Sequence, residues 1–310
     1  MNDSREIEIE LPHLRLAARA WGDPALPKLL AVHGWLDNAA SFDALAPLLC
    51  GHFHIVALDL AGHGRSAHRP PGLWYHYVDY LGDVLTAADA LGWQHFSLLG
   101  HSLGGAIASM LAGVEPARVE RLLLIEALGP MSLPAQQILA HLQRSLGERG
   151  QTGTLRVFAS EEDAAKARMR GNGLSLSREA AMALIGRGTM AVAGGVSWSS
   201  DQRLTLTSPT RYTEEQIQSV LSGIQAPTLL VLAEPSPPFL TAAMIAGRSA
   251  CVPGIRIVRI PGSHHLHLED AQPVARDPRL RSVLNQAREF GLQRVAIHLE
   301  PVALRTPVRI

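Results

Sequence analysis

The sequence contains few cysteines. Cys50 and Cys251 are the two in 310 residues, and they do not form a C-x-x-C pair. This usage argues against a disulfide framework and against a zinc site built on thiolates. We expect both to be small buried apolar side chains in a reducing cytoplasm.

Net charge is also lacking, because 28 Lys and Arg residues balance 28 Asp and Glu residues. A chain without a net field has little attraction for nucleic acid or an anionic membrane, so neither is predicted as a partner. Residues 94–114 carry no charged side chain, but four glycines interrupt them, so no membrane span is expected. The acidic segment 1–10 lacks the apolar region of a secretory signal, and a cytoplasmic location is expected.

What the chain does contain is an alternation of strand-like and helix-like segments. Residues 6–10 and 14–18 alternate as an antiparallel pair would. The apolar segments that follow predict strands at 28–32, 54–58, 96–99, 121–125, 228–233 and 256–260. Helical patterns occupy 39–49, 76–91, 103–113, 238–246 and 273–290. This order predicts an α/β fold with a mostly parallel central sheet flanked by helices.

About a hundred residues with a different sequence pattern separate the predicted strands at 121–125 and 228–233. Helical patterns occur at 136–146, 161–169 and 178–185, whereas 194–212 shows no clear period. A stretch this long is not a simple connection. We therefore expect a helical cap at 130–225, inserted between core segments 1–129 and 226–290, with a tail of uncertain structure at 291–310.

The most informative motif is Gly100 to Gly104, which reads G-H-S-L-G. An apolar strand precedes it and a small-residue helix follows, which is the context of a nucleophile in a sharp strand-to-helix turn. Ser102 is the predicted nucleophile. The same pattern also arises by chance in glycine-rich chains.

A serine hydroxyl needs a base, and we expect His264, which follows the last core strand at a glycine turn. His265 and His267 are competing candidates. A metal site in this histidine-rich run is a further alternative, although no matching ligand spacing is found elsewhere.

The acid that orients the base is expected at another strand end. Glu126 follows the apolar segment 122–125 directly, and an ionised carboxylate there needs a partner. Glu234, at the end of the strand at 229–233, is the competitor, and Glu126 could instead cap the first turn of the insertion.

Developing charge on a substrate carbonyl needs donors, which we expect to be the backbone N–H groups of Trp35 and Leu103. Leu36 and His101 are expected to line the substrate pocket.

These segments together resemble the α/β-hydrolase superfamily over about two thirds of the chain. Agreement lies in His33 to Trp35, Asp59 to Ser66, Gly100 to Gly105, and Gly262 to His264 followed by Glu269. The longer run 33–49 is similar to the serine hydrolase-like branch, whose members resemble esterases. We interpret the loop at 59–66 as structural, because a tight turn explains its glycines.

The resemblance has one departure. Many relatives carry an Asp acid a few residues after the strand at 228–233, where this chain has Ser236. Other members, including haloalkane dehalogenases, have a carboxylate where this chain has Glu126. Dehalogenation is not implied, because those enzymes use an Asp nucleophile.

The sequence therefore predicts a serine hydrolase acting on a small-molecule carboxylic ester through an acyl-enzyme, without cofactor or metal. A lactonase, thioesterase or C–C bond hydrolase would use the same residues. An acyltransferase and a non-hydrolytic ligand-binding receptor are further alternatives. Oligomeric state is not predicted.

Overall fold

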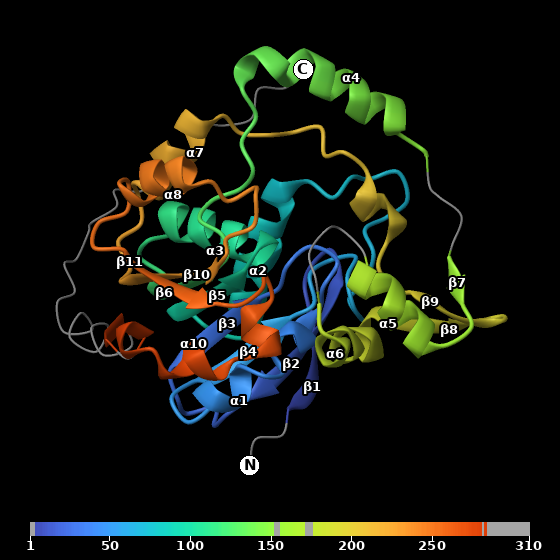
Figure 1. The fold of residues 1–310 in the computed structure, drawn as a ribbon, viewed down its shortest axis with the longest axis horizontal. Helices are drawn as coiled ribbons and strands as arrows, with labels where there is room; N and C mark the ends of the chain where they lie inside the picture. Colours follow the sequence, from blue (N-terminus) through green and yellow to red (C-terminus); the bar gives the residue numbers. More distant parts are fainter. Residues whose placement is uncertain (1–3, 152–155, 171–175, 281, 284–310) are drawn as a thin grey trace, which may run out of the picture.

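Eight strands form one sheet at the centre of the protein, with helices on both faces (Figure 1). The computed structural model describes residues 4–151, 156–170, 176–280 and 282–283. The strand order is β1-β2-β4-β3-β5-β6-β10-β11, in which β1-β2 and β2-β4 pair antiparallel and the other neighbours pair parallel. The strands are β1 (Arg5–Glu10), β2 (Arg15–Trp21), β3 (Lys28–Val32), β4 (His54–Leu58), β5 (Phe96–His101), β6 (Val119–Ile125), β10 (Thr228–Glu234) and β11 (Arg256–Pro261). The predicted fold class is confirmed.

Helices α2 (Tyr77–Ala90), α3 (Leu103–Val114), α7 (Glu214–Leu221) and α8 (Ala242–Ser249) pack around this sheet (Figure 1). Shorter helical segments are η1 (Ala39–Phe42), α1 (Ala46–Leu49), η2 (Ala135–Gln137), η3 (Gln202–Thr205), α9 (Leu266–Glu269) and α10 (Gln272–Arg276). No helix in the described part of the chain is both long and apolar enough to cross a membrane.

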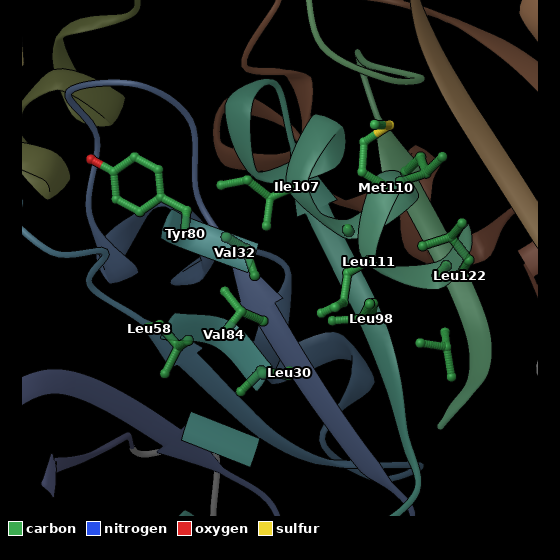
Figure 2. Close-up of a cluster of buried hydrophobic side chains, with 14 of the residues drawn as sticks. Leu30, Val32, Leu58, Tyr80, Val84, Leu98, Ile107, Met110, Leu111 and Leu122 are labelled. Atoms are coloured by element: carbon green, nitrogen blue, oxygen red, sulfur yellow. The ribbon is translucent and has the colours of Figure 1, made fainter. Parts of the chain in front are cut away.

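The central strands are apolar on both sides because both faces of the sheet are covered. In β3, Leu30 and Val32 belong to one buried cluster, while Leu29 and Ala31 belong to the cluster on the opposite face. This follows the two-residue period of a strand. Figure 2 shows the first cluster, in which side chains of the strands meet those of α2 and α3.

Two predicted helices differ from those observed. Residues 39–49 form η1 and α1 rather than one helix, and Pro47 gives the reason. A proline ring inside a helix collides with the carbonyl four residues earlier, so α1 begins at Ala46. The helix predicted at 238–246 begins at Ala242, because the Thr241 hydroxyl caps it by accepting from the Met244 N–H at 3.2 Å.

Most of the chain between β6 and β10 lies outside the main sheet, with α4 apart from α5 and α6 (Figure 1). It contains α4 (Ile138–Glu148), α5 (Glu161–Arg170) and α6 (Arg178–Gly188). It also contains a small antiparallel sheet of β7 (Val157–Phe158), β9 (Gly195–Trp198) and β8 (Thr189–Val192), where sequence patterning indicated no strand. We call residues 130–212 the cap. Helix α7 lies within the expected insertion but packs on α3 in the main core.

At the C-terminal end of the chain, α10 covers the start of the helix predicted at 273–290. The predicted single helix is interrupted at Asp277, which has an extended ψ of 127° and precedes Pro278. Residues from 284 onward, including the tail at 291–310, lie outside the described residues.

Candidate active site

Ser102 lies in the turn between β5 and α3. Its backbone has φ 52° and ψ −116°, in the region that L residues adopt under constraint. The Ser102 N–H donates to the carbonyl of Ile125 at 2.9 Å, which fixes the turn against the end of β6. Its side chain is partly exposed, so a hydroxyl is presented at the carboxyl edge of the sheet.

The two glycines of the motif are required by close backbone approach. A Cβ added to Gly100 would lie 2.3 Å from the carbonyl oxygen of Gly104. A Cβ added to Gly104 would lie 1.9 Å from the carbonyl oxygen of Val32 in β3. Neither contact is sterically possible, so the tight crossing of α3 over the sheet depends on both glycines.

Glu126 follows β6 directly and is fully buried, with φ 59°. Its N–H donates to the carbonyl of Val231, and its Oε1 accepts from the N–H of Ala233 at 2.5 Å. Both partners belong to the neighbouring strand β10. The carboxylate is therefore oriented by backbone groups of the sheet.

The other oxygen of Glu126 contacts His264. Nδ1 of His264 lies 2.9 Å from Glu126 Oε2, and both side chains are buried. Because a carboxylate only accepts, Nδ1 is the donor, and in the neutral ring this tautomer has its lone pair on Nε2. Glu234, the competing acid, is exposed to solvent at the end of β10. The structure thus brings His264 and Glu126 together.

The competing histidines have other partners. Nε2 of His265 lies 3.2 Å from Asp37 Oδ2, and Nε2 of His267 lies 2.9 Å from the hydroxyl of Ser41. Burial lowers the pKa of His267 to about 3, which keeps it neutral near pH 7. These two side chains stabilise the loop that carries His264.

The segment expected to bind an oxyanion is a tight turn after β3. The N–H of Asp37 donates to the carbonyl of Gly34 at 3.1 Å, and Leu36 within the turn has φ 60°. The Trp35 side chain is 41% exposed, and its indole N–H donates to the carbonyl of Leu204 in the cap. The second expected donor, Leu103, is the first residue of α3, where a helix leaves N–H groups without an intrahelical partner.

His101 lies beneath the site rather than in a pocket wall. Its exposed fraction is 0%, and its ring packs against three other imidazoles, with centroid distances of 4.8 Å to His264, 4.9 Å to His265 and 4.2 Å to His267. This differs from the expectation that it lines the substrate pocket. His101 is the last residue of β5, and the loop that carries His264, His265 and His267 packs on its ring.

The buried cluster of Asp37, His101 and His265 is the group of described residues that could hold a metal ion. One ligand atom from each lies within 4.8 Å of the other two. However, the Asp37 carboxylate also accepts from Arg168 Nη2 at 2.5 Å. A divalent cation there would place two further positive charges beside a partly buried guanidinium, which is costly.

Two ion pairs, each with a buried carboxylate in the core, connect the cap to the core. Arg168 of α5 pairs with Asp37, and Nε of Arg187 in α6 lies 2.9 and 2.8 Å from the two carboxylate oxygens of Asp59. Asp59 also accepts from the N–H groups of Ala39 and Arg65, consistent with a structural role for its loop. Sequence patterning gave no signal for these arginines, because each partner is more than 120 residues away.

Comparison with known proteins places the chain in a family. The family model of the alpha/beta hydrolase fold matches residues 27–271. The chain therefore belongs to the α/β hydrolase fold family, and it is a hydrolase by family.

Its relatives include several serine hydrolase-like proteins. It is 32% identical to serine hydrolase-like protein 2 of Homo sapiens over 87% of this chain and 91% of the relative. It is 30% identical to a serine hydrolase-like protein of Danio rerio, over 87% and 86%. Among solved structures, a hypothetical protein of Pseudomonas aeruginosa PAO1 is 42% identical with a TM-score of 0.81, over 92% of this chain and 99% of that one. The thioesterase domain from the curacin biosynthetic pathway is 27% identical with a TM-score of 0.79, over 90% and 99%.

Proposed function

We propose that the protein is a serine hydrolase that cleaves carboxylic esters, with Ser102 as nucleophile, His264 as base and Glu126 as acid. The observation that carries the proposal is the hydrogen bond from His264 Nδ1 to Glu126 Oε2, at the sheet edge where the Ser102 turn is fixed. It leaves Nε2 of His264 as the proton acceptor.

In this mechanism Ser102 Oγ attacks the ester carbonyl while His264 Nε2 takes the hydroxyl proton. The backbone N–H groups of Leu103 and Trp35 stabilise the oxyanion. Leu103 begins a twelve-residue helix, whose positive N-terminal end favours developing negative charge. The imidazolium then protonates the leaving alcohol, and water activated by the same histidine releases the acid.

Thioesters are a second substrate class. The specific observation is the 27% identity to the curacin thioesterase domain over 90% of this chain. The three residues would act on a thioester as they do on an ester, because the acyl group passes to Ser102 in both cases. A thiolate is the better leaving group and needs less protonation by His264. Paired oxoester and thioester substrates with the same acyl group distinguish the two classes by kcat/KM.

The test is Ser102→Ala assayed on p-nitrophenyl acetate and butyrate, with Ser222→Ala as a matched control at an exposed position after α7. We expect Ser102→Ala to lose activity by at least about 10³-fold and Ser222→Ala to retain it. Full activity in Ser102→Ala would contradict the proposal. Failure of a fluorophosphonate probe to label Ser102 in the wild-type protein would favour a ligand-binding receptor instead.

A further inference from the structure

Asp37 connects four parts of the protein that meet at the site. Its Oδ1 accepts from Arg168 of cap helix α5 at 2.5 Å, and its Oδ2 lies 3.2 Å from His265 Nε2. Its own N–H closes the turn to Gly34, and its Oδ2 lies 3.7 Å from His101 Nδ1. One buried residue thus contacts the cap, the loop that carries His264, the turn after β3 and the strand that precedes Ser102.

His101 in turn holds His264 by two contacts. Its Nε2 lies 2.9 Å from the backbone oxygen of His264, and the two rings pack at a centroid distance of 4.8 Å. The rings of Phe239 and His264 pack in a T-shaped arrangement, with their centroids 5.4 Å apart and their planes at 81°. Both the backbone and the ring of His264 are therefore constrained by the buried side chain of His101.

The protonation state of His101 follows from its partners. A carbonyl oxygen only accepts, so Nε2 carries the proton and Nδ1 presents a lone pair toward Asp37. Nδ1 has no hydrogen-bond partner among the described residues. Burial lowers the pKa of His101 well below its usual value, so the ring is neutral at pH 7.

Asp37 is therefore held by its other two partners. Burial alone would raise the pKa of Asp37, but His265 and the Arg168 guanidinium hold it well below its ordinary value. Arg168 carries the fixed positive charge of this group. Without that charge, a buried carboxylate faces a lone pair of His101, which is unfavourable.

We propose that His101 and Asp37 are positioning residues for His264, and that Arg168 makes the alignment of His264 depend on cap helix α5. The inference rests on the ester hydrolysis proposed above. It identifies His101 and Asp37 as residues that act through His264 and do not touch the substrate.

The first experiment separates the two contacts of His101. His101→Phe keeps a ring against His264 but removes the donor to its carbonyl, whereas His101→Gln keeps an amide N–H that can reach that carbonyl. We expect His101→Phe to lower kcat roughly 10-fold with little change in KM, because small misplacement of a reacting group is costly. His101→Gln should restore most of kcat. Thermal unfolding of both variants identifies any loss of kcat that comes from loss of folded protein.

The second experiment tests the link to the cap. Arg168→Met removes the guanidinium but keeps the aliphatic stem, and Arg178→Met is the matched control in an exposed cap pair with Glu162. We expect kcat to fall several-fold in Arg168→Met and to stay unchanged in Arg178→Met. In the His101→Phe background, Arg168→Met should lower kcat by a smaller factor than it does in the wild-type protein. Both substitutions act on the position of the His264 ring, so their effects are not additive.

Three kinetic outcomes would overturn the inference. They are wild-type kcat in a folded His101→Phe protein, equal loss in the Phe and Gln variants, and strictly additive effects in the double variant. One divalent cation per chain, lost on His265→Gln, would also overturn it, because Asp37 and His101 would then be metal ligands. Loss of function in Ser102→Ala is a separate requirement, so failure of ester hydrolysis is distinguished from failure of positioning.

Discussion

The imidazole of His264 donates from Nδ1 to Glu126 Oε2 at 2.9 Å, although 138 residues separate the two in the chain. Adjacent parallel strands produce this contact, because Glu126 directly follows β6, which pairs with β10, and β10 pairs with β11, which precedes His264. The carboxylate also accepts from a backbone N–H of β10, so its orientation belongs to the sheet.

Replacing Glu126 by Gln should lower kcat by about 10³-fold. The new amide would present its NH₂ to His264 Nδ1, which favours the tautomer with the proton on Nε2, where it cannot act as a base. Glu234→Gln makes the same chemical change at the exposed end of β10 and should keep kcat within about two-fold. Steady-state kinetics on p-nitrophenyl butyrate measures both. Equal losses in the two variants would count against Glu126 as the acid.

Gly104→Ala should destabilise the fold by about 2–3 kcal/mol and abolish activity. The added Cβ would lie 1.9 Å from the Val32 carbonyl oxygen, so α3 must move away from the sheet. Gly82→Ala is the control in the exposed middle of α2, where nothing lies within 4 Å of an added Cβ. It should stabilise by about 0.5–1 kcal/mol. Urea unfolding gives both free energies, and a Gly104→Ala protein as stable as wild type would show that the close approach is not required.

Arg187→Met should destabilise the protein by about 3–5 kcal/mol. The change leaves Asp59 fully buried without its guanidinium partner, and the desolvated charge is then poorly compensated. Arg144→Met breaks an exposed pair with Glu148 in α4 and should cost less than about 1 kcal/mol. Chemical denaturation distinguishes the two, and an effect in Arg187→Met no larger than that in Arg144→Met would contradict this prediction.

Stability should fall as pH decreases below about 6.5, before the carboxylates titrate. Burial lowers the pKa of His63 and of His267 to about 3, whereas an unfolded histidine titrates near 6.5. Between these values the unfolded chain binds more protons, so each group reduces stability by roughly 1 kcal/mol per pH unit as pH falls. His267→Gln keeps a partner for Ser41 but does not titrate. Its free energy of unfolding should therefore depend less steeply on pH between 6 and 4, and an unchanged slope would show that His267 is protonated in the fold.

The parts of the fold that sequence could predict are those set by local patterns. The strands around Ser102 were predicted within a few residues, because a sheet covered on both faces requires uninterrupted apolar segments. Helix predictions were wrong at 39–49 and 238–246. A proline and a capping threonine determine where these helices begin, and hydrophobic periodicity does not detect either signal.

Sequence by itself determined which residues could react. The G-x-S-x-G turn and a carboxylate directly after an apolar strand follow from neighbours in the chain, whereas the resemblance to the hydrolase family shows that Ser236 stands where many relatives carry the acid. Only the tertiary structure decided what surrounds them: the inward position of His101, the pairing of Asp37 with Arg168 and the attachment of the cap by Arg187. These depend on contacts between groups more than 120 residues apart, for which local propensity and spacing carry no information.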